Sequence, residues 1–156
     1  MKNRGFALGS FVAVFLALLA CKRGGTVTNA QFGTLVRKPT GHLSIKAPAT
    51  RLPRVAAEKG DIPHSFGVCF DYTQGEQLGK MEVVVRPPAP IKTLHLTSGQ
   101  KAKPGEIRLS APYLRRSGSF CQDMYFDADD PLGNWGFELQ RDRDRIKAWT
   151  VEVYQP

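Results

Sequence analysis

The chain has 156 residues, of which 42% are hydrophobic and 23% are charged, and its formal net charge is +8. This length is sufficient for one domain with its own hydrophobic core. The basic residues form no dense patch interleaved with aromatic residues, which argues against a nucleic-acid partner.

Residues 1–20 are organised like a secretory signal. Lys2 and Arg4 form a positively charged start, and a continuous apolar run follows. That run has the length of the hydrophobic region of a signal peptide and is too short for a typical membrane-spanning helix. It ends in Leu-Leu-Ala, directly before Cys21.

This ending, Leu-Leu-Ala-Cys, resembles the lipobox of bacterial lipoproteins. In that family the chain is cut before the cysteine, whose thiol carries a diacylglycerol and whose new amine is acylated. The resemblance implies that residues 1–20 are removed and that Cys21 is lipidated. Lys22 follows the cysteine, which by the same resemblance implies an outer-membrane anchor facing the periplasm. An ordinary cleaved signal with an incidental cysteine is the alternative.

The segment after the cysteine is polar and contains paired glycines. We therefore expect residues 21–30 to comprise the lipidated cysteine and a flexible tether, and residues 31–156 to form one folded domain. Within that domain, short runs with β-type alternation are separated by Pro and Gly clusters, and no helical periodicity of useful length occurs. The expected strands are 31–38, 43–47, 50–56, 65–72, 80–86, 91–97, 106–110, 119–127, 135–141 and 145–154, with a loop at 99–105.

Short strands with turn signals between them predict an all-β fold, an antiparallel β-sandwich of about seven to nine strands. Two cysteines remain when Cys21 is set aside, and in an oxidising compartment we expect a Cys69–Cys121 disulfide. Because side chains alternate along a strand, Cys69 should face away from the core side occupied by Phe70. The bridge would then join neighbouring strands on the outer face of one sheet. A bulge at Gly67 would invert this orientation, and two buried free thiols are the alternative.

Four segments together resemble a bacterial family known as domain of unknown function 3859: 60–70 (GDIPHSFGVCF), 85–88 (VRPP), 130–139 (DPLGNWGFEL) and 149–153 (WTVEV). The resemblance extends over roughly residues 31–154 and implies an immunoglobulin-like fold. One departure is Arg86, which stands where the family pattern has a histidine, so no role for a histidine there carries over.

The sequence contains few candidates for chemistry. Asp127, Asp129 and Asp130 could supply oxygen ligands to calcium, or they could stabilise a turn through their own backbone. The three histidines lack metal-ligand spacing, and no nucleophile elbow or phosphate-binding glycine loop occurs. We therefore expect no cofactor and no enzymatic activity.

The sequence thus predicts a noncatalytic, lipid-anchored envelope protein with a binding or structural role. Its expected partners are the membrane, through the anchor, and an envelope protein or cell-wall component. The alternative is a periplasmic inhibitor or immunity protein that acts on a cell-wall hydrolase or toxin. Such a protein would use a protruding loop, either 99–105 or 114–118, and Arg115 and Arg116 in the second loop are candidate partner-binding residues.

Overall fold

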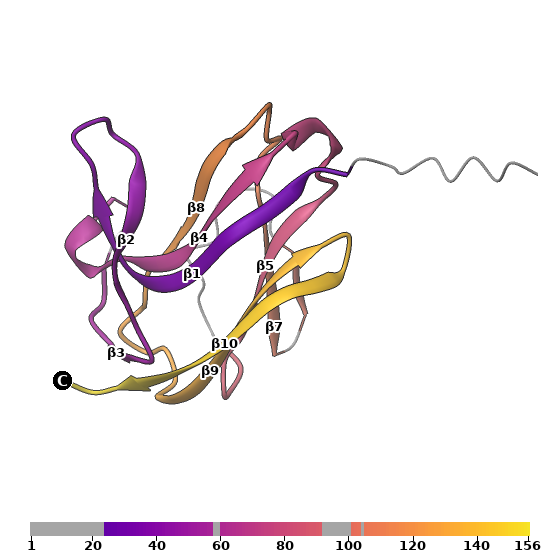
Figure 1. Cartoon of the computed structure of the whole chain (residues 1–156). Helices are drawn as coiled ribbons and strands as arrows, with labels where there is room; N and C mark the ends of the chain where they lie inside the picture. The colour runs from indigo at the N-terminus through magenta and orange to yellow at the C-terminus, as the bar shows by residue number, and fades with distance from the viewer. Residues whose placement is uncertain (1–23, 58–59, 92–100, 104) are drawn as a thin grey trace, which may run out of the picture.

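The computed structural model describes residues 24–57, 60–91, 101–103 and 105–156, which form two packed β-sheets (Figure 1). The smaller sheet has four strands in the order β2-β1-β4-β8. Its strands are β1 (Thr26–Arg37), β2 (Leu43–Pro48), β4 (Phe66–Thr73) and β8 (Gly118–Met124).

The larger sheet has six strands in the order β3-β10-β9-β5-β7-β6. All neighbours in both sheets are antiparallel except β3 and β10, which run parallel. Two 3₁₀ turns, η1 (Ile62–His64) and η2 (Gly75–Gln77), occur in the connections. The strands of this sheet are β3 (Arg51–Pro53), β5 (Met81–Arg86), β6 (Lys101–Lys103), β7 (Glu106–Ser110), β9 (Gly133–Arg141) and β10 (Asp144–Tyr154).

The antiparallel β-sandwich predicted from the sequence is confirmed. Several boundaries differ, and the expected strand 119–127 ends at Met124 as β8. β1 begins at Thr26, inside the segment expected to be tether, because Thr26 and the residue after it already pair with β4. The expected strand 50–56 is shortened to β3, which ends at Pro53. The expected loop 99–105 contains β6, and the expected strand 91–97 lies outside the described residues except for Ile91.

Aromatic rings hold the two sheets together. Phe32 of β1 packs against Phe137 of β9, with ring centroids 4.5 Å apart, and the ring of Phe66 of β4 lies 5.9 Å from the same Phe137 ring. The alternation expected for β4 is present, since Phe66 and Phe70 are both buried in the core. Burial of this apolar surface is the main stabilising contribution to such a fold.

The β9–β10 hairpin turns without a glycine. Its central residues, Asp142 and Arg143, have φ angles of 51° and 77°, a left-handed conformation for which glycine or asparagine is the usual choice. Asp142 is fixed from outside the turn: its Oδ1 accepts the Lys80 N–H at 2.8 Å, and its own N–H donates to the Lys80 carbonyl at 2.9 Å. Contacts with the start of β5 thus support a turn sequence that is weak by itself.

The Cys69–Cys121 disulfide is present and lies where alternation placed it. The two residues are directly opposite in the register of β4 and β8, on the face turned away from the other sheet. The β1–β2 hairpin reaches this bridge, because the carbonyl oxygen of Leu43 lies 3.3 Å from Cys121 Sγ. The bridge therefore ties the edge strand β8 to the sheet interior on the outer face.

Removing this bridge should destabilise the domain. The double substitution Cys69→Ala/Cys121→Ala is expected to lower the free energy of unfolding by about 4 kcal/mol, the chain-entropy contribution of a loop of this length. Urea denaturation measures it, with Cys21→Ala as a control that leaves the bridge intact. Equal stability of the double variant and the parent would contradict the assignment of a stabilising role.

Candidate functional site

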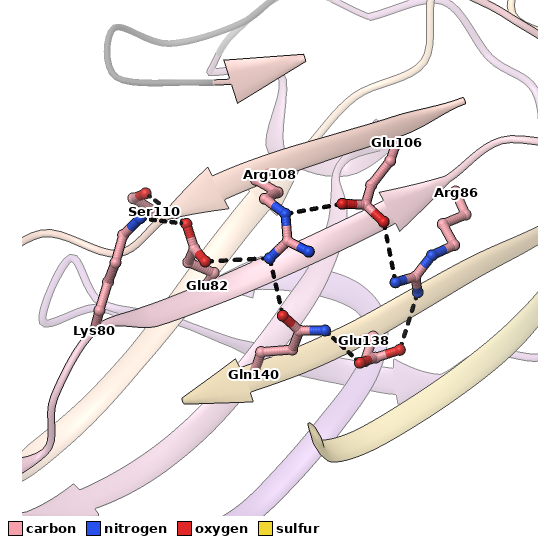
Figure 2. Close-up of polar contacts among 8 residues, drawn as sticks. All are labelled: Lys80, Glu82, Arg86, Glu106, Arg108, Ser110, Glu138 and Gln140. Carbon is pink, nitrogen blue, oxygen red and sulfur yellow. Dashed lines mark hydrogen bonds and ion pairs between the residues drawn. The ribbon is translucent and has the colours of Figure 1, made fainter. Parts of the chain in front are cut away.

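The outer face of the larger sheet carries a network of charged and polar side chains on β5, β7 and β9 (Figure 2). Three of them are buried although they point away from the core: Glu82 is 6% exposed, Glu138 4% and Gln140 6%. Buried polar groups are costly unless each finds a partner. The network is therefore a candidate functional site.

Five of these side chains form a closed ring. Arg108 contacts Glu106 at 2.8 Å and donates to the Gln140 amide oxygen at 2.9 Å. Arg86 contacts Glu106 at 3.2 Å and Glu138 at 2.9 Å, and the Gln140 amide donates to Glu138. Val84, which faces Arg108 and Glu138 in the register, is fully buried beneath the ring.

Two carboxylates of this network, Glu82 and Glu138, are held in their charged form. Burial raises the pKa of Glu82, but the hydrogen bond and charge of Lys80 and the charge of Arg108 outweigh it, so the pKa lies below its ordinary value. Burial likewise raises the pKa of Glu138, and the hydrogen bonds from Gln140, Arg145 and Arg86 reverse the effect. These side chains are hydrogen-bonded or ion-paired with one another, so the network covers Val84 and leaves none of the groups named here available as a reactive group.

Removal of Arg108 should destabilise the domain, because buried polar groups would lose their partner. Arg108→Ala leaves Glu82, Glu106 and Gln140 each short of one donor, and is expected to lower the free energy of unfolding by about 2 kcal/mol. Arg145→Ala is the matched control. Its side chain is 67% exposed and Glu138 keeps Arg86, so the expected loss is below about 0.5 kcal/mol. Equal losses in denaturant unfolding would refute the ring as a cooperative unit.

The acidic cluster forms a turn between β8 and β9. The Asp130 side chain points inward, where its Oδ2 accepts the Asp127 N–H at 2.8 Å, and Arg54 donates to the Asp130 backbone carbonyl at 2.7 Å. Within the described part of the chain, no group of three or more His, Cys, Asp or Glu side chains could hold a metal ion. The hydrogen bond between the Asp127 N–H and the Asp130 carboxylate is the kind of contact that the turn interpretation expects.

Burial disfavours the charged form of the Asp130 carboxyl group. Burial is the main cause that raises its pKa from 3.8 to about 6, and the hydrogen bond from Asp127 offsets only part of this effect. Its second carboxylate oxygen, Oδ1, is buried without a hydrogen-bond partner. Because the folded-state pKa lies above the unfolded one, the stabilising contribution of this group is complete below pH 3.8 and is lost as the pH rises through about 6.

Asp130→Asn should therefore change how stability depends on pH. Asparagine keeps an oxygen for the Asp127 N–H and never ionises, so the variant is expected to gain stability relative to the parent as the pH rises from about 4 to about 7. Urea denaturation across that range measures the difference between the two proteins. Asp144→Asn, at an exposed position, is the control and should show no such trend. A constant difference between parent and Asp130→Asn would contradict the raised pKa.

The candidate residues Arg115 and Arg116 lie in the connection between β7 and β8, and both are exposed. The Arg115 guanidinium lies 5.8 Å from the ring centroid of Tyr113, whose side chain is 71% exposed. Arg116 has a φ of 57°, and its carbonyl accepts the Gly75 N–H, which ties the connection to η2. A pocket of about 400 Å³ opens between these two segments, lined by Gly75, Glu76, Gly79, Lys80, Met81, Ala111, Pro112, Tyr113 and Leu114.

Within the described residues, His64 and Ser65 do not form a nucleophile–base pair. His64 pairs with Asp61 at 2.8 Å on the surface, and the neighbouring Ser65 is buried with its hydroxyl donating to the Ile62 carbonyl. A serine enclosed in this way is not accessible as a nucleophile. His42 is exposed in the β1–β2 hairpin, while His95 and Cys21 lie outside the described residues.

Comparison with solved structures defines the fold class. An immunoglobulin-like protein (PA1606) from Pseudomonas aeruginosa is similar, with a TM-score of 0.60 and 10% sequence identity, over 86% of this chain and 99% of that chain. The chain is therefore an immunoglobulin-like β-sandwich. No family model and no curated protein matches it, so the comparisons do not support the resemblance to domain of unknown function 3859.

Proposed function

We propose that this protein is a noncatalytic lipoprotein of the bacterial cell envelope that binds a partner or provides structural support. The observation that carries the proposal is the Leu-Leu-Ala-Cys ending of a signal-like segment, followed within five residues by the first strand of an immunoglobulin-like sandwich. Lipid chains on Cys21 would hold this domain at a membrane surface, because two or more acyl chains make release very slow.

The disulfide fits this compartment. Disulfides persist in oxidising environments such as the bacterial periplasm and are rare in the cytosol. Cys69 and Cys121 are bridged on a half-buried outer face, where a reducing compartment would have access to them. By the resemblance to lipoprotein sorting signals, Lys22 favours the outer membrane with the domain facing the periplasm. In the described ranges, no helix combines the length and apolar character that crossing a bilayer requires.

A binding or structural role agrees with the geometry. The described histidines are not hydrogen-bonded to a described serine or sulfur, and the side chains of the charged network on the larger sheet pair with one another. Inhibition of a cell-wall hydrolase or toxin would need a protruding loop. The segment with Arg115 and Arg116 is instead tied back to Gly75 of η2, and it lies at the end of the sandwich where the chain arrives from Cys21. We therefore favour the binding or structural role.

Mass spectrometry of the natively expressed protein tests the anchor. We expect the chain to begin at Cys21 with a mass increase equal to a diacylglyceryl group and a fatty acid, and to fractionate with membranes. Cys21→Ser should remove the lipid, and the protein should leave the membrane fraction. Lys22→Ala is the matched control that keeps the acceptor thiol. An unmodified Cys21 in membrane-free protein would refute the proposal.

A further inference from the structure

We propose that the end of the sandwich that carries Tyr113, Arg115 and Arg116 docks on anionic lipid headgroups of the membrane. We call it the anchor end; it comprises η2, the 111–117 connection and the β9–β10 turn. The inference rests on the proposed lipidation of Cys21, and it adds an orientation and a lipid class to it. Three observations carry it: where the chain enters the fold, which charges surround that point, and which aromatic side chain is exposed there.

The chain enters the sandwich at the anchor end. The Gly25 N–H donates to the Gln77 carbonyl of η2 at 3.2 Å, and Arg141 at the end of β9 donates to the Gly25 carbonyl at 2.7 Å. Only four residue steps separate Gly25 from Cys21. Fully extended, they span about 14 Å. A lipid on Cys21 would therefore keep this end beside the bilayer, while the opposite end points away (Figure 1).

The charges at the anchor end favour an anionic surface. Five cations and three acids lie in it or directly beside it, although the Lys80 ammonium is already ion-paired with Glu82. Lys22 and Arg23 add two more positive charges in the sequence that leads to it. One of the acids, Asp142, is engaged by the backbone of Lys80. The opposite end carries the Asp127–Asp130 turn. The charged residues of the anchor end are Lys80, Arg115, Arg116, Arg141, Arg143, Glu76, Asp142 and Asp144.

Tyr113 supplies the contact that suits an interface between water and lipid. Its ring is 71% exposed with the Arg115 guanidinium beside it. Tyrosine is enriched at headgroup depth in membranes, because its ring is apolar and its hydroxyl is polar. Arginine near an anionic leaflet is attracted to it, and the attraction falls off within a Debye length. Because the anchor would already hold the domain at the surface, weak contacts of this kind are sufficient to orient it.

Limited proteolysis of the native lipoprotein in vesicles tests the orientation. Chymotrypsin can cut after Tyr113 at the anchor end and after Leu132, which is 45% exposed at the opposite end. We expect cleavage after Tyr113 to be about tenfold slower on phosphatidylglycerol vesicles than on phosphatidylcholine vesicles, and the protection to weaken in high salt. Cleavage after Leu132 should proceed at the same rate on both.

Variants separate charge from anchoring. Arg115→Gln/Arg116→Gln should abolish the difference between the two vesicle types at Tyr113. Lys38→Gln/Lys46→Gln, at exposed positions of the β1–β2 hairpin, should retain it. Circular dichroism of each variant checks that the fold is unchanged.

The outcomes distinguish the two proposals. Protein that floats with both kinds of vesicle but is protected at Tyr113 on neither overturns the docking and leaves the lipid anchor standing. Protein that carries no lipid and does not float overturns the anchor itself. Equal protection on both lipids overturns the role of charge. Protection that occurs only in native envelope membranes would mean that a protein covers this end, which also overturns the docking.

Discussion

The packing of Phe32 and Phe66 of one sheet against Phe137 of the other is the interaction on which the rest of the structure depends. Once these rings face inward, alternation along each strand decides what faces outward. On the smaller sheet this places the disulfide outside, and on the larger sheet it places the Glu82–Val84–Arg86 row outside. On the outer face of the smaller sheet, the β1–β2 hairpin contacts the disulfide through Leu43. On the outer face of the larger sheet, the ring of charged side chains covers Val84.

Features that depend on the local alternation of side chains could be predicted from the sequence. Features that depend on which strands pair, and in which register, could not. Most strands follow from the alternation of apolar and polar residues along the sequence. The outward orientation of the disulfide follows from the same alternation along β4 and β8. The ring could not be anticipated, because Arg86 and Glu138 are 52 residues apart and meet only through the pairing of β5 with β9. The early start of β1 was missed for the same reason, since Thr26 becomes a strand residue by pairing with Thr73. The turn at Asp142 depends on Lys80, which local turn statistics do not include.

The likeness to the immunoglobulin-like protein of Pseudomonas aeruginosa describes architecture, because at 10% identity few surface residues are shared. In sandwiches of this class, recognition commonly resides in the connections at the two ends rather than in the sheet faces. In this protein the sheet faces and the connections also differ in what they present. Its faces are occupied by internal contacts, whereas the connections carry the exposed Tyr113 and Leu132 at opposite ends.

The course of β10 has a practical consequence for work with this protein. The strand runs for 11 residues from the anchor end to the far end, a distance of roughly 36 Å, and the chain leaves the sandwich there (Figure 1). A fluorescent protein or affinity tag fused after Pro156 would consequently sit a full domain length from the site of entry. It would report on the molecule without crowding Gly25, whereas the same tag inserted before Thr26 would occupy the short spacer itself.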